Sequence, residues 1–182
     1  TVCEAHNAGT AAVAVAINYS DGITNEISDL QPGQSKIIKQ SEEAHTLKVF
    51  SGTLASTDSP IVVTVVEEGN TLFSYNGFGS GSTNPIMPLV NQNNYGYFTG
   101  IQIQNTGDSD TIVTVSYTPS ISGTACSETR TVPAGASKTF SQYVFYERKD
   151  ESDDPNFETD CVMDETFIGS GKVSTNTASM PL

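Results

Sequence analysis

The sequence TVCEAHNAGTAAVAVAINYS (Thr1–Ser20) is repeated in outline by TGIQIQNTGDSDTIVTVSYT (Thr99–Thr118), at an offset of 98 residues and without a gap. A second block, LQPGQSKIIKQ (Leu30–Gln40), matches VPAGASKTFSQ (Val132–Gln142) at an offset of 102. Repetition of this kind within one chain is typical of an array of structural modules rather than of a single catalytic body.

A third and weaker block keeps the same order along the chain. SGTLAST (residues 51–57) matches SGKVST (residues 170–175), so the spacing between matching blocks grows towards the C-terminus. A chain of 182 residues is long enough for two small modules. We therefore expect one module in residues 1–80 and another in residues 81–182.

Strand signals are dense and helix signals are nearly absent. AVAVAINYS (residues 12–20) and TIVTVSYT (residues 111–118) alternate β-forming residues with small or polar ones, as strands with one buried face do. Frequent turn signals between short strands predict an all-β fold of two immunoglobulin-like β-sandwich modules. In the first module the expected strands lie near residues 1–7, 11–19, 23–30, 35–40, 45–56 and 61–68.

The segment between the modules, residues 68–98, is rich in Gly, Ser and Asn but also in aromatic and aliphatic residues. Such a segment is too apolar for a free coil. We expect an ordered, aromatic-rich hinge that packs along both modules, with GFGSGS (residues 77–82) as its loose part. Its aromatic side chains also allow a second interpretation, a platform for glycans.

The three cysteines favour a secreted protein. Cys126 and Cys161 both lie in the second module, and a disulfide between them would close an insertion onto the module body. Cys3 is then left over, either as a small buried hydrophobe in the first strand or as a bond to a neighbouring subunit.

The formal net charge of −13 excludes some classes of partner. Nucleic acids and anionic lipid surfaces are bound through Lys and Arg, and this chain has 8 basic residues against 21 acidic ones. We therefore expect no nucleic acid partner. No apolar run is long enough to cross a bilayer, so we also expect no membrane insertion.

The insertion of the second module, residues 146–165, holds nine of the acidic residues. Carboxylates packed this closely repel one another unless they are solvated or bridged by a cation, and calcium is the natural ligand for oxygen donors. The alternative is a solvated acidic loop that binds nothing. No other cofactor is expected, and the candidate calcium ligands are Asp150, Asp153, Asp154, Glu158 and Asp160.

Motifs for catalysis are lacking in this sequence. His6 lies in an HNAG stretch whose counterpart is QNTG, which indicates a turn, and His45 is interpreted as a residue of an exposed strand. No nucleophile elbow, zinc-binding helix or phosphate loop is recognised. We therefore expect no enzymatic activity.

Several stretches resemble a known type of repeat. SYNGFGSGSTNPIMPLVNQNNYGYFTGIQIQNTG (residues 74–107), followed by TVSY, TVPAGASKTF and FIGSGKVST, is similar to the tandem Ig-like repeats of large secreted bacterial surface and filament proteins. The resemblance covers most of both modules and implies an extracellular, cell-surface, non-catalytic modular protein. Its motifs are turns and strands, so it implies no functional residues.

The repeat also predicts an incomplete second module. Module one continues into the strand SPIVVTVVEE (residues 59–68), whereas module two reaches only STNTASMPL (residues 174–182), so we expect its sandwich to be one strand short. The missing strand comes either from further polypeptide or from a neighbouring copy, as in pilus-like donor-strand complementation. The residues expected to take part in this assembly are Thr1, Val2, Cys3, Met180 and Leu182.

Two functions remain open at this point. One is a structural subunit of an extracellular filament or surface layer, a homopolymer assembled head to tail by donation of a β-strand. The other is a cell-surface adhesin or carbohydrate-binding module that contacts surface glycans.

Overall fold

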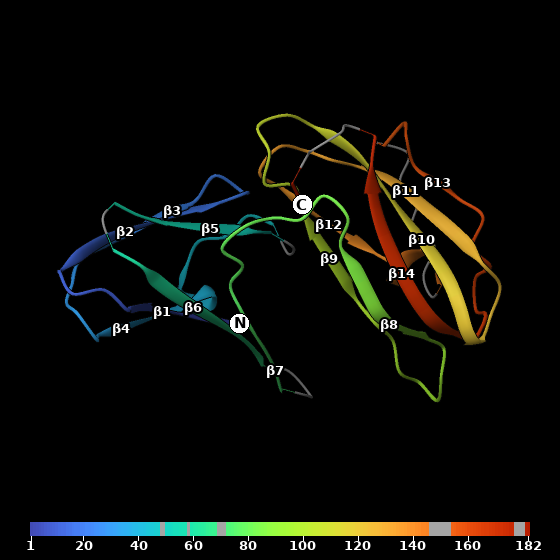
Figure 1. The fold of residues 1–182 in the computed structure, drawn as a ribbon, viewed down its shortest axis with the longest axis horizontal. Coiled ribbons are helices and arrows are strands. Elements are labelled where there is room, and N and C mark those ends of the chain that lie inside the picture. Colours follow the sequence, from blue (N-terminus) through green and yellow to red (C-terminus); the bar gives the residue numbers. More distant parts are fainter. Residues whose placement is uncertain (48–49, 58, 69–71, 146–153, 177–180) are drawn as a thin grey trace. The chain divides into compact units, whose positions relative to one another are not determined.

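A computed structural model describes residues 1–47, 50–57, 59–68, 72–145, 154–176 and 181–182. These residues form an all-β structure whose helical elements are a 3-10 turn, η1 (Gln40–Glu42), and one short helix, α1 (Gln142–Phe145) (Figure 1). No helix among them has the length and apolar character needed to cross a membrane.

The chain divides into two compact units, Thr1–Gly79 (unit 1) and Ser80–Leu182 (unit 2). Unit 1 contains two sheets, with strand orders β4-β1-β6-β7 and β3-β2-β5. Its strands are β1 (Val2–Asn7), β2 (Val13–Tyr19), β3 (Thr24–Leu30), β4 (Ser35–Lys39), β5 (Gly52–Ser56), β6 (Ile61–Glu68) and β7 (Leu72–Asn76).

The two sheets of unit 1 share one hydrophobic core. Cys3 and Ala5 of β1 are buried together with Val15 and Ile17 of β2, and Val63 of β6 packs against the same cluster. Buried and exposed positions alternate along β2, which is the period of two that its sequence predicts. The arrangement is consistent with a β-sandwich.

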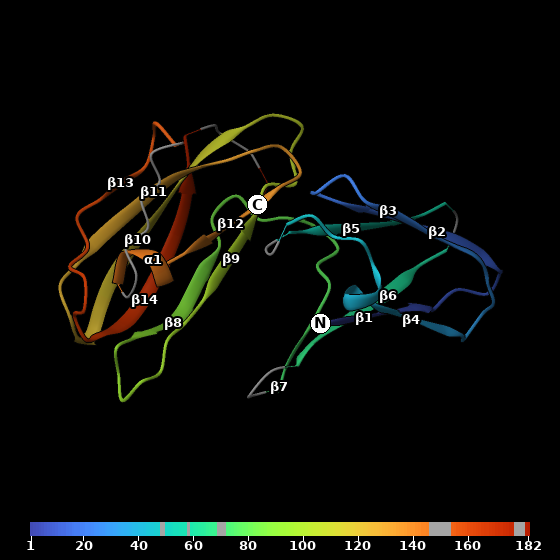
Figure 2. The same cartoon turned by 180° about the vertical axis from the view of Figure 1, so that it is seen from behind.

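Unit 2 also contains two sheets, with strand orders β13-β11-β10-β14-β8 and β12-β9 (Figure 2). The helix α1 follows β12. The strands are β8 (Ile86–Gln92), β9 (Ile101–Gln104), β10 (Thr111–Ser122), β11 (Cys126–Val132), β12 (Ser137–Phe140), β13 (Glu158–Thr159) and β14 (Phe167–Thr175).

The core of unit 2 is richer in aromatic side chains. Tyr117, Phe145 and Phe167 are buried and their rings lie 5.2–6.0 Å apart between centroids. Ile101 and Ile103 of β9 belong to the same cluster, so the short sheet is packed against the long one. Aromatic pairs at such distances stabilise a core beyond their buried area.

The repeat seen in the sequence also holds for the pairing of strands. Tyr19 of β2 lies opposite Gly52 of β5, and the matching residues Tyr117 and Gly171 lie opposite each other in β10 and β14. Strands β1 to β4 thus correspond to β9 to β12, and β5 corresponds to β14.

The region expected to be a hinge consists largely of strands that belong to the two units. Strand β7 pairs with β6 in unit 1, and β8 pairs with β14 in unit 2. The GFGSGS stretch is also held, because the Gly77 amide donates to the Val63 carbonyl at 2.8 Å and Ser82 exchanges two backbone hydrogen bonds with Leu182. A hinge over residues 68–98 was therefore too broad an interpretation.

Two local expectations in unit 1 were wrong. Of the strand expected over residues 45–56, the described residues form only Gly52–Ser56, and His6 lies within β1 rather than in a turn. The His6 ring lies 3.0 Å from the Ser35 hydroxyl of β4. At the start of the range expected to be a strand, the Thr46 amide donates to the Asp21 carboxylate at 3.1 Å.

A buried asparagine fastens the turn after β1 to the end of β3. The Asn7 side-chain amide donates to the carbonyls of Ala11 and Leu30, both at 2.8 Å, and its oxygen accepts the Gly9 amide at 2.9 Å. The side chain has no exposed surface. All three bonds satisfy backbone groups, and the Leu30 carbonyl among them is buried.

The same arrangement of three side-chain hydrogen bonds recurs around Asn105 in unit 2. The Asn105 side-chain amide donates to the carbonyls of Ser109 at 2.8 Å and Val132 at 3.0 Å, and its oxygen accepts the Gly107 amide at 2.9 Å. The N-x-G pattern that recurs in both repeats is therefore explained by one hydrogen-bonding requirement.

We expect Asn7→Ala and Asn105→Ala each to destabilise only the unit that contains the substitution. One buried carbonyl, one partly buried carbonyl and one amide lose their partners, which costs about 2–4 kcal/mol in the free energy of unfolding. Denaturant titration followed by residue-resolved NMR separates the two units. Asn18→Ala, an exposed position on β2, is the matched control, and equal effects of all three substitutions would contradict this assignment.

Candidate functional site

The edge of β9 in unit 2 differs from the edge of its counterpart β1. Strand β1 is paired on both sides, so that Ala5 lies opposite Lys36 of β4 and opposite Val63 of β6. In β9 the matching residue Ile103 lies opposite Lys138 of β12, in the same register. On the other side of β9, no strand of the described residues is paired.

Residues 181–182 form backbone hydrogen bonds on this second side of β9. In unit 1 the Ala8 amide donates to the Pro60 carbonyl at 3.0 Å, immediately before β6 starts. In unit 2 the matching amide, that of Thr106, donates to the Pro181 carbonyl at 3.2 Å. Pro181 therefore occupies the place of Pro60.

Leu182 likewise occupies the place of Ile61, the first residue of β6. Each of these side chains is partly buried against the core of its own unit. Leu182 is also fixed from the other side, because its backbone amide and carbonyl bond Ser82 at 3.1 and 3.0 Å. A β-carbon on Gly81 would lie only 2.7 Å from the Leu182 carbonyl oxygen, so this approach requires glycine.

The backbone groups of β9 alternate between the two edges, as in any antiparallel strand. The Asn105 amide donates to the Ala136 carbonyl at 2.9 Å, on the β12 side, whereas Thr106 bonds on the opposite side. By alternation, the amide and carbonyl of Gln102 face the second edge of β9, on which no described strand is paired and which we call the open edge. The side chains of Ile101 and Ile103, each 6% exposed, point into the core.

The structure corrects the expected role of the N-terminus. Val2 and Cys3 belong to β1, which pairs with β4 and β6 along its length, and the Thr1 carbonyl accepts a bond from Gln40 at 3.1 Å. A strand held on both sides is not free to be donated. Thr1, Val2 and Cys3 therefore do not form a donor segment in this structure.

The third cysteine is also accounted for. Cys3 is buried, 7% exposed, and forms no disulfide. Burial raises the pKa of its thiol, which keeps it protonated and unreactive. It is a small apolar core residue, which matches the first of its two interpretations. Of the expected assembly residues at the other end, Leu182 lies at the β9 edge and Met180 lies outside the described residues.

Cys126 and Cys161 form a disulfide that holds the end of the insertion against β11. Next to it, Asp160 accepts bonds from the Ser127 amide at 2.6 Å and from the Ser127 hydroxyl at 3.2 Å. The two-residue strand β13 pairs with β11 just before this point. The C-terminal part of the insertion is therefore attached to the sheet.

Three of the five candidate calcium ligands, Asp154, Glu158 and Asp160, lie among the described residues. Asp150 and Asp153 lie outside the described residues. Asp154 is used structurally, since it accepts the Thr131 amide at 2.8 Å and the Thr131 hydroxyl at 2.9 Å, and Glu158 lies exposed on β13.

The described acidic residues do not converge on a common point. Among the described residues, one group of three candidate ligands lies within 4.8 Å, namely Asp160 with Cys126 and Cys161. Those two sulfur atoms are bonded to each other and do not act as thiolate ligands. Calcium binding by the insertion stays a prediction.

Hydrogen bonding perturbs both structural carboxylates. The Ser127 amide holds the pKa of Asp160 below its ordinary value. For Asp154, burial acts to raise the pKa, but bonds from the amides of Thr131 and Asn156 outweigh it and lower the pKa. Both groups therefore favour the charged form in the folded state.

His45, which we interpreted as exposed, lies inside unit 1. Its side chain is 8% exposed, its Nδ1 lies 2.9 Å from Asp21 Oδ2, and its ring stacks on Phe50 at 3.8 Å. The Asp21 pKa is raised by burial but lowered more strongly by the bonds from His45 and the Thr46 amide. The pair caps one end of the core beside Tyr19.

A second buried polar group was not recognised in the sequence. Glu128 accepts the Tyr117 hydroxyl at 2.9 Å, the Ser141 amide at 2.8 Å and the Arg130 Nε. Burial, followed by the neighbouring Glu128, raises the pKa of Tyr117 well above its ordinary value. The Arg130 guanidinium lies 4.7 Å from the ring centroid of Phe157. This network ties β10, β11 and the insertion together within the core.

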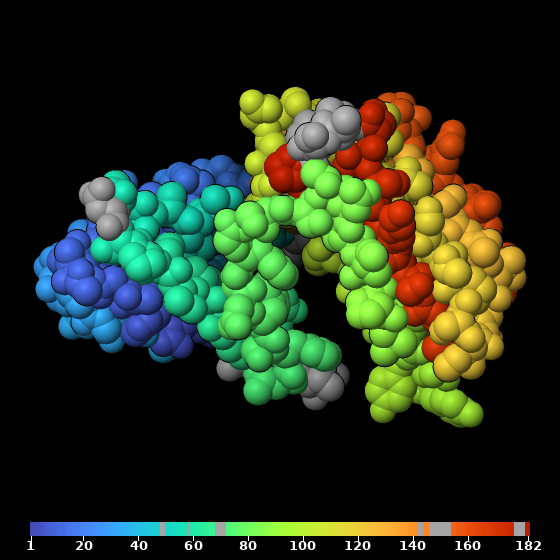
Figure 3. Space-filling view, in the orientation of Figure 1, coloured from blue at the N-terminus to red at the C-terminus, as the bar shows by residue number. Residues whose placement is uncertain are grey.

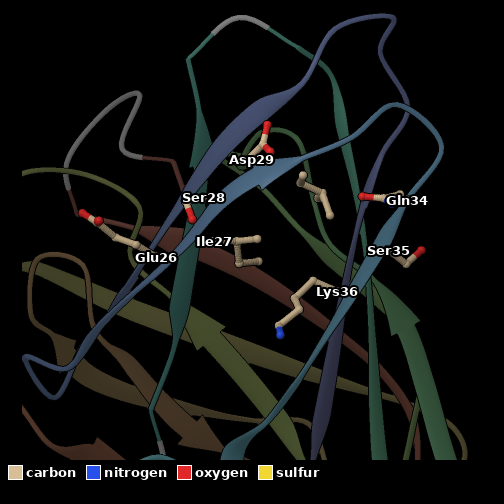
Figure 4. A pocket seen from close by; sticks show the side chains of 8 residues that line it. Glu26, Ile27, Ser28, Asp29, Gln34, Ser35 and Lys36 are labelled. Carbon is tan, nitrogen blue, oxygen red and sulfur yellow. The ribbon is translucent and has the colours of Figure 1, made fainter.

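A shallow groove lies between β3 and β4 in unit 1 (Figure 4). Glu26 and Ile27 line it from β3, and Gln34 and Lys36 line it from the other side. Because β3 and β4 are the outer strands of the two sheets, the groove is the lateral opening of the unit. It brings together none of the expected site residues.

Comparisons of this chain with family models, with curated proteins and with solved structures returned no match.

Removal of the disulfide is expected to weaken unit 2 alone. The bond joins residues 35 apart, and closing a loop of that length stabilises the folded state by about 3–4 kcal/mol. The Cys126→Ala and Cys161→Ala double variant should lose this amount in denaturant titration, whereas Cys3→Ala should affect unit 1. A double variant as stable as the parent would contradict the pairing.

Acid should destabilise unit 2 partly through Asp154 and Asp160. Because their folded pKa values are lowered, the stabilisation is complete above the unfolded value of about 3.9 and is lost as the pH falls through the folded values. Denaturant titrations between pH 6 and 2 should show a smaller acid-induced loss for the Asp154→Asn and Asp160→Asn double variant. An unchanged slope would contradict the assignment.

Proposed function

We propose that this chain is a non-catalytic structural subunit of an extracellular filament or surface layer, in which copies join head to tail by adding a β-strand to the open edge of β9. The observation that carries this proposal is the contrast between β1, which β6 covers, and β9, which no described strand covers.

The proposal rests first on the cost of an open edge. In unit 1 the Glu4 backbone, the counterpart of Gln102, faces β6, which pairs Glu4 with Thr64. An uncovered edge presents backbone donors and acceptors together with the rim of an apolar core, and it is a ready template for another strand. Strand addition supplies main-chain hydrogen bonds for affinity and side-chain pockets for specificity.

Two further features support an extracellular structural role. The Cys126–Cys161 disulfide fits an oxidising environment. The sequence resemblance to tandem Ig-like repeats of secreted bacterial surface proteins agrees with two related all-β units in one chain. The buried polar groups His45 and Glu128 are engaged in bonds that hold the core.

A second candidate function, adhesion or carbohydrate binding, has one observation in its favour. Tyr95 and Tyr97, between β8 and β9, are 96% and 71% exposed. Tyr95 also has a left-handed backbone, with φ of +52°, which is rare for a bulky residue and often marks functional loops. Exposed aromatic rings offer flat apolar faces on which sugar rings stack.

Proline at position 102 provides a selective test of the filament. Because the Gln102 amide faces the open edge, Gln102→Pro leaves the bonds of β9 to β12 in place and blocks an added strand. Gln102→Ala removes the same side-chain bond to Thr139 but keeps the amide, so it is the matched control.

Electron microscopy and sedimentation should show filaments for the parent chain and for Gln102→Ala, and monomers for Gln102→Pro. The far-ultraviolet circular dichroism and the unfolding midpoints of the two substituted chains should agree. A parent chain that stays monomeric at high concentration, or a proline variant that still polymerises, would overturn the proposed function.

A further inference from the structure

If copies assemble as in the proposed function, on which this inference rests, one segment of a second copy must cover β9. Strand β7 is the outermost strand of the unit 1 sheet, and all five of its side chains are exposed. Leu72, Phe73 and Tyr75 are 71%, 62% and 48% exposed. In the space-filling view the chain around β7 forms part of the outer surface of unit 1 (Figure 3).

The outer strands of this protein are not equally protected against pairing. Natural sheets block their edges with charges or proline. Strand β4 carries Lys36 and Lys39, β3 carries Glu26, β8 carries Pro88 and β12 carries Lys138. In contrast β7 (LFSYN) and β9 (IQIQ) contain neither a charge nor proline. The edge strand β5 also lacks them, but its exposed residues are small.

The backbone of β7 is oriented for addition on its outer side. The Gly77 amide donates to the Val63 carbonyl of β6, so by alternation Tyr75 and Phe73 present their backbone groups to β6. The amide and carbonyl of Ser74 therefore face outward. Ser74 in β7 is thus the counterpart of Gln102 in β9.

The side chains of β7 also suit the edge of β9. Tyr75 lies opposite Val65, which packs against the core, so Tyr75 and Phe73 lie on the core-side face of the sheet. Beside β9 that same face carries Ile101 and Ile103. Covering a large apolar side chain is worth about 1.5–3 kcal/mol, so two of them add substantially to the main-chain bonds.

Net charge restricts where two copies meet. Each copy carries −13, so contacts between acidic surfaces are repulsive, whereas β7 and β9 are uncharged. Exposed charges further away are screened by salt. Assembly through these strands should therefore become stronger as the salt concentration rises.

We propose that β7 of one copy pairs through its outer edge with β9 of a second copy. The two short sheets then merge into one of order β4-β1-β6-β7-β9-β12, with β7 in the place that β6 occupies beside β1. Each copy offers one β7 edge and one β9 edge, so the contact is head to tail and the chain of copies stays open.

Two proline variants that block opposite ends test this pairing. Ser74→Pro removes the outward amide of β7, and Gln102→Pro removes that of β9, while Ser74→Ala and Gln102→Ala keep the amides. Each proline variant alone should stay monomeric. Mixed in equal amounts, the two should form a 1:1 dimer, because the intact β7 of the Gln102→Pro chain pairs with the intact β9 of the Ser74→Pro chain. Nothing larger should form, because the two edges that remain in this dimer are both blocked by proline.

Other outcomes distinguish the alternatives. If Ser74→Pro forms filaments while Gln102→Pro does not, the proposed function stands and β7 is not the donor. If Ser74→Pro forms dimers by itself, β9 pairs with β9, which overturns the inference. Ser74→Lys, which adds a charge without changing the backbone, should also block assembly. If it assembles like the parent chain, the loss caused by Ser74→Pro reflects misfolding of β7 and the pairing is rejected.

Discussion

Backbone pairing of the first strand in each unit is the constraint on which the rest of this structure depends. In unit 1, β1 lies in the interior of its sheet, and its amides and carbonyls are taken up by β4 and β6. In unit 2, β9 buries side chains at the matching positions and has the same register with β12, but its second side has no described strand beside it. Strand addition by a second copy is the interaction that we propose removes this difference.

Among the described residues, the two units differ in which of their sheets carries additional strands. Unit 1 has β6 and β7 on its β1 sheet, whereas unit 2 has β8 on its β14 sheet. Strand β5, the counterpart of β14, has β2 on one side and no described strand on the other. Strands β5, β7 and β9, whose sequences contain neither charge nor proline, each have an edge beside which no described strand lies.

The sequence predicted much of this fold because its repeat reflects local requirements. The N-x-G pattern recurs because Asn7 and Asn105 satisfy matching backbone groups, and the glycine of the PGQS and PAGAS corners recurs because Gly33 and Gly135 adopt φ of +73° and +68°.

What the sequence could not predict depends on partners that are distant along the chain. Whether Cys3 lies on a central or an edge strand is decided by β6, some 60 residues later, so donation by the N-terminus was a reasonable but wrong expectation. Likewise His45 is buried because Asp21 and Phe50 surround it in the folded unit. Strands β7 and β8 looked like a hinge because their pairing partners, β6 and β14, belong to different units.

Amide hydrogen exchange at Glu4 and Gln102 tests the central claim most directly, because these matching residues face the covered edge of β1 and the open edge of β9. In dilute solution, below the concentration at which copies associate, the account predicts strong protection of the Glu4 amide and exchange of the Gln102 amide close to that of a solvent-exposed peptide. Equal and strong protection at both positions would show that β9 is already covered within a single copy, which contradicts the account.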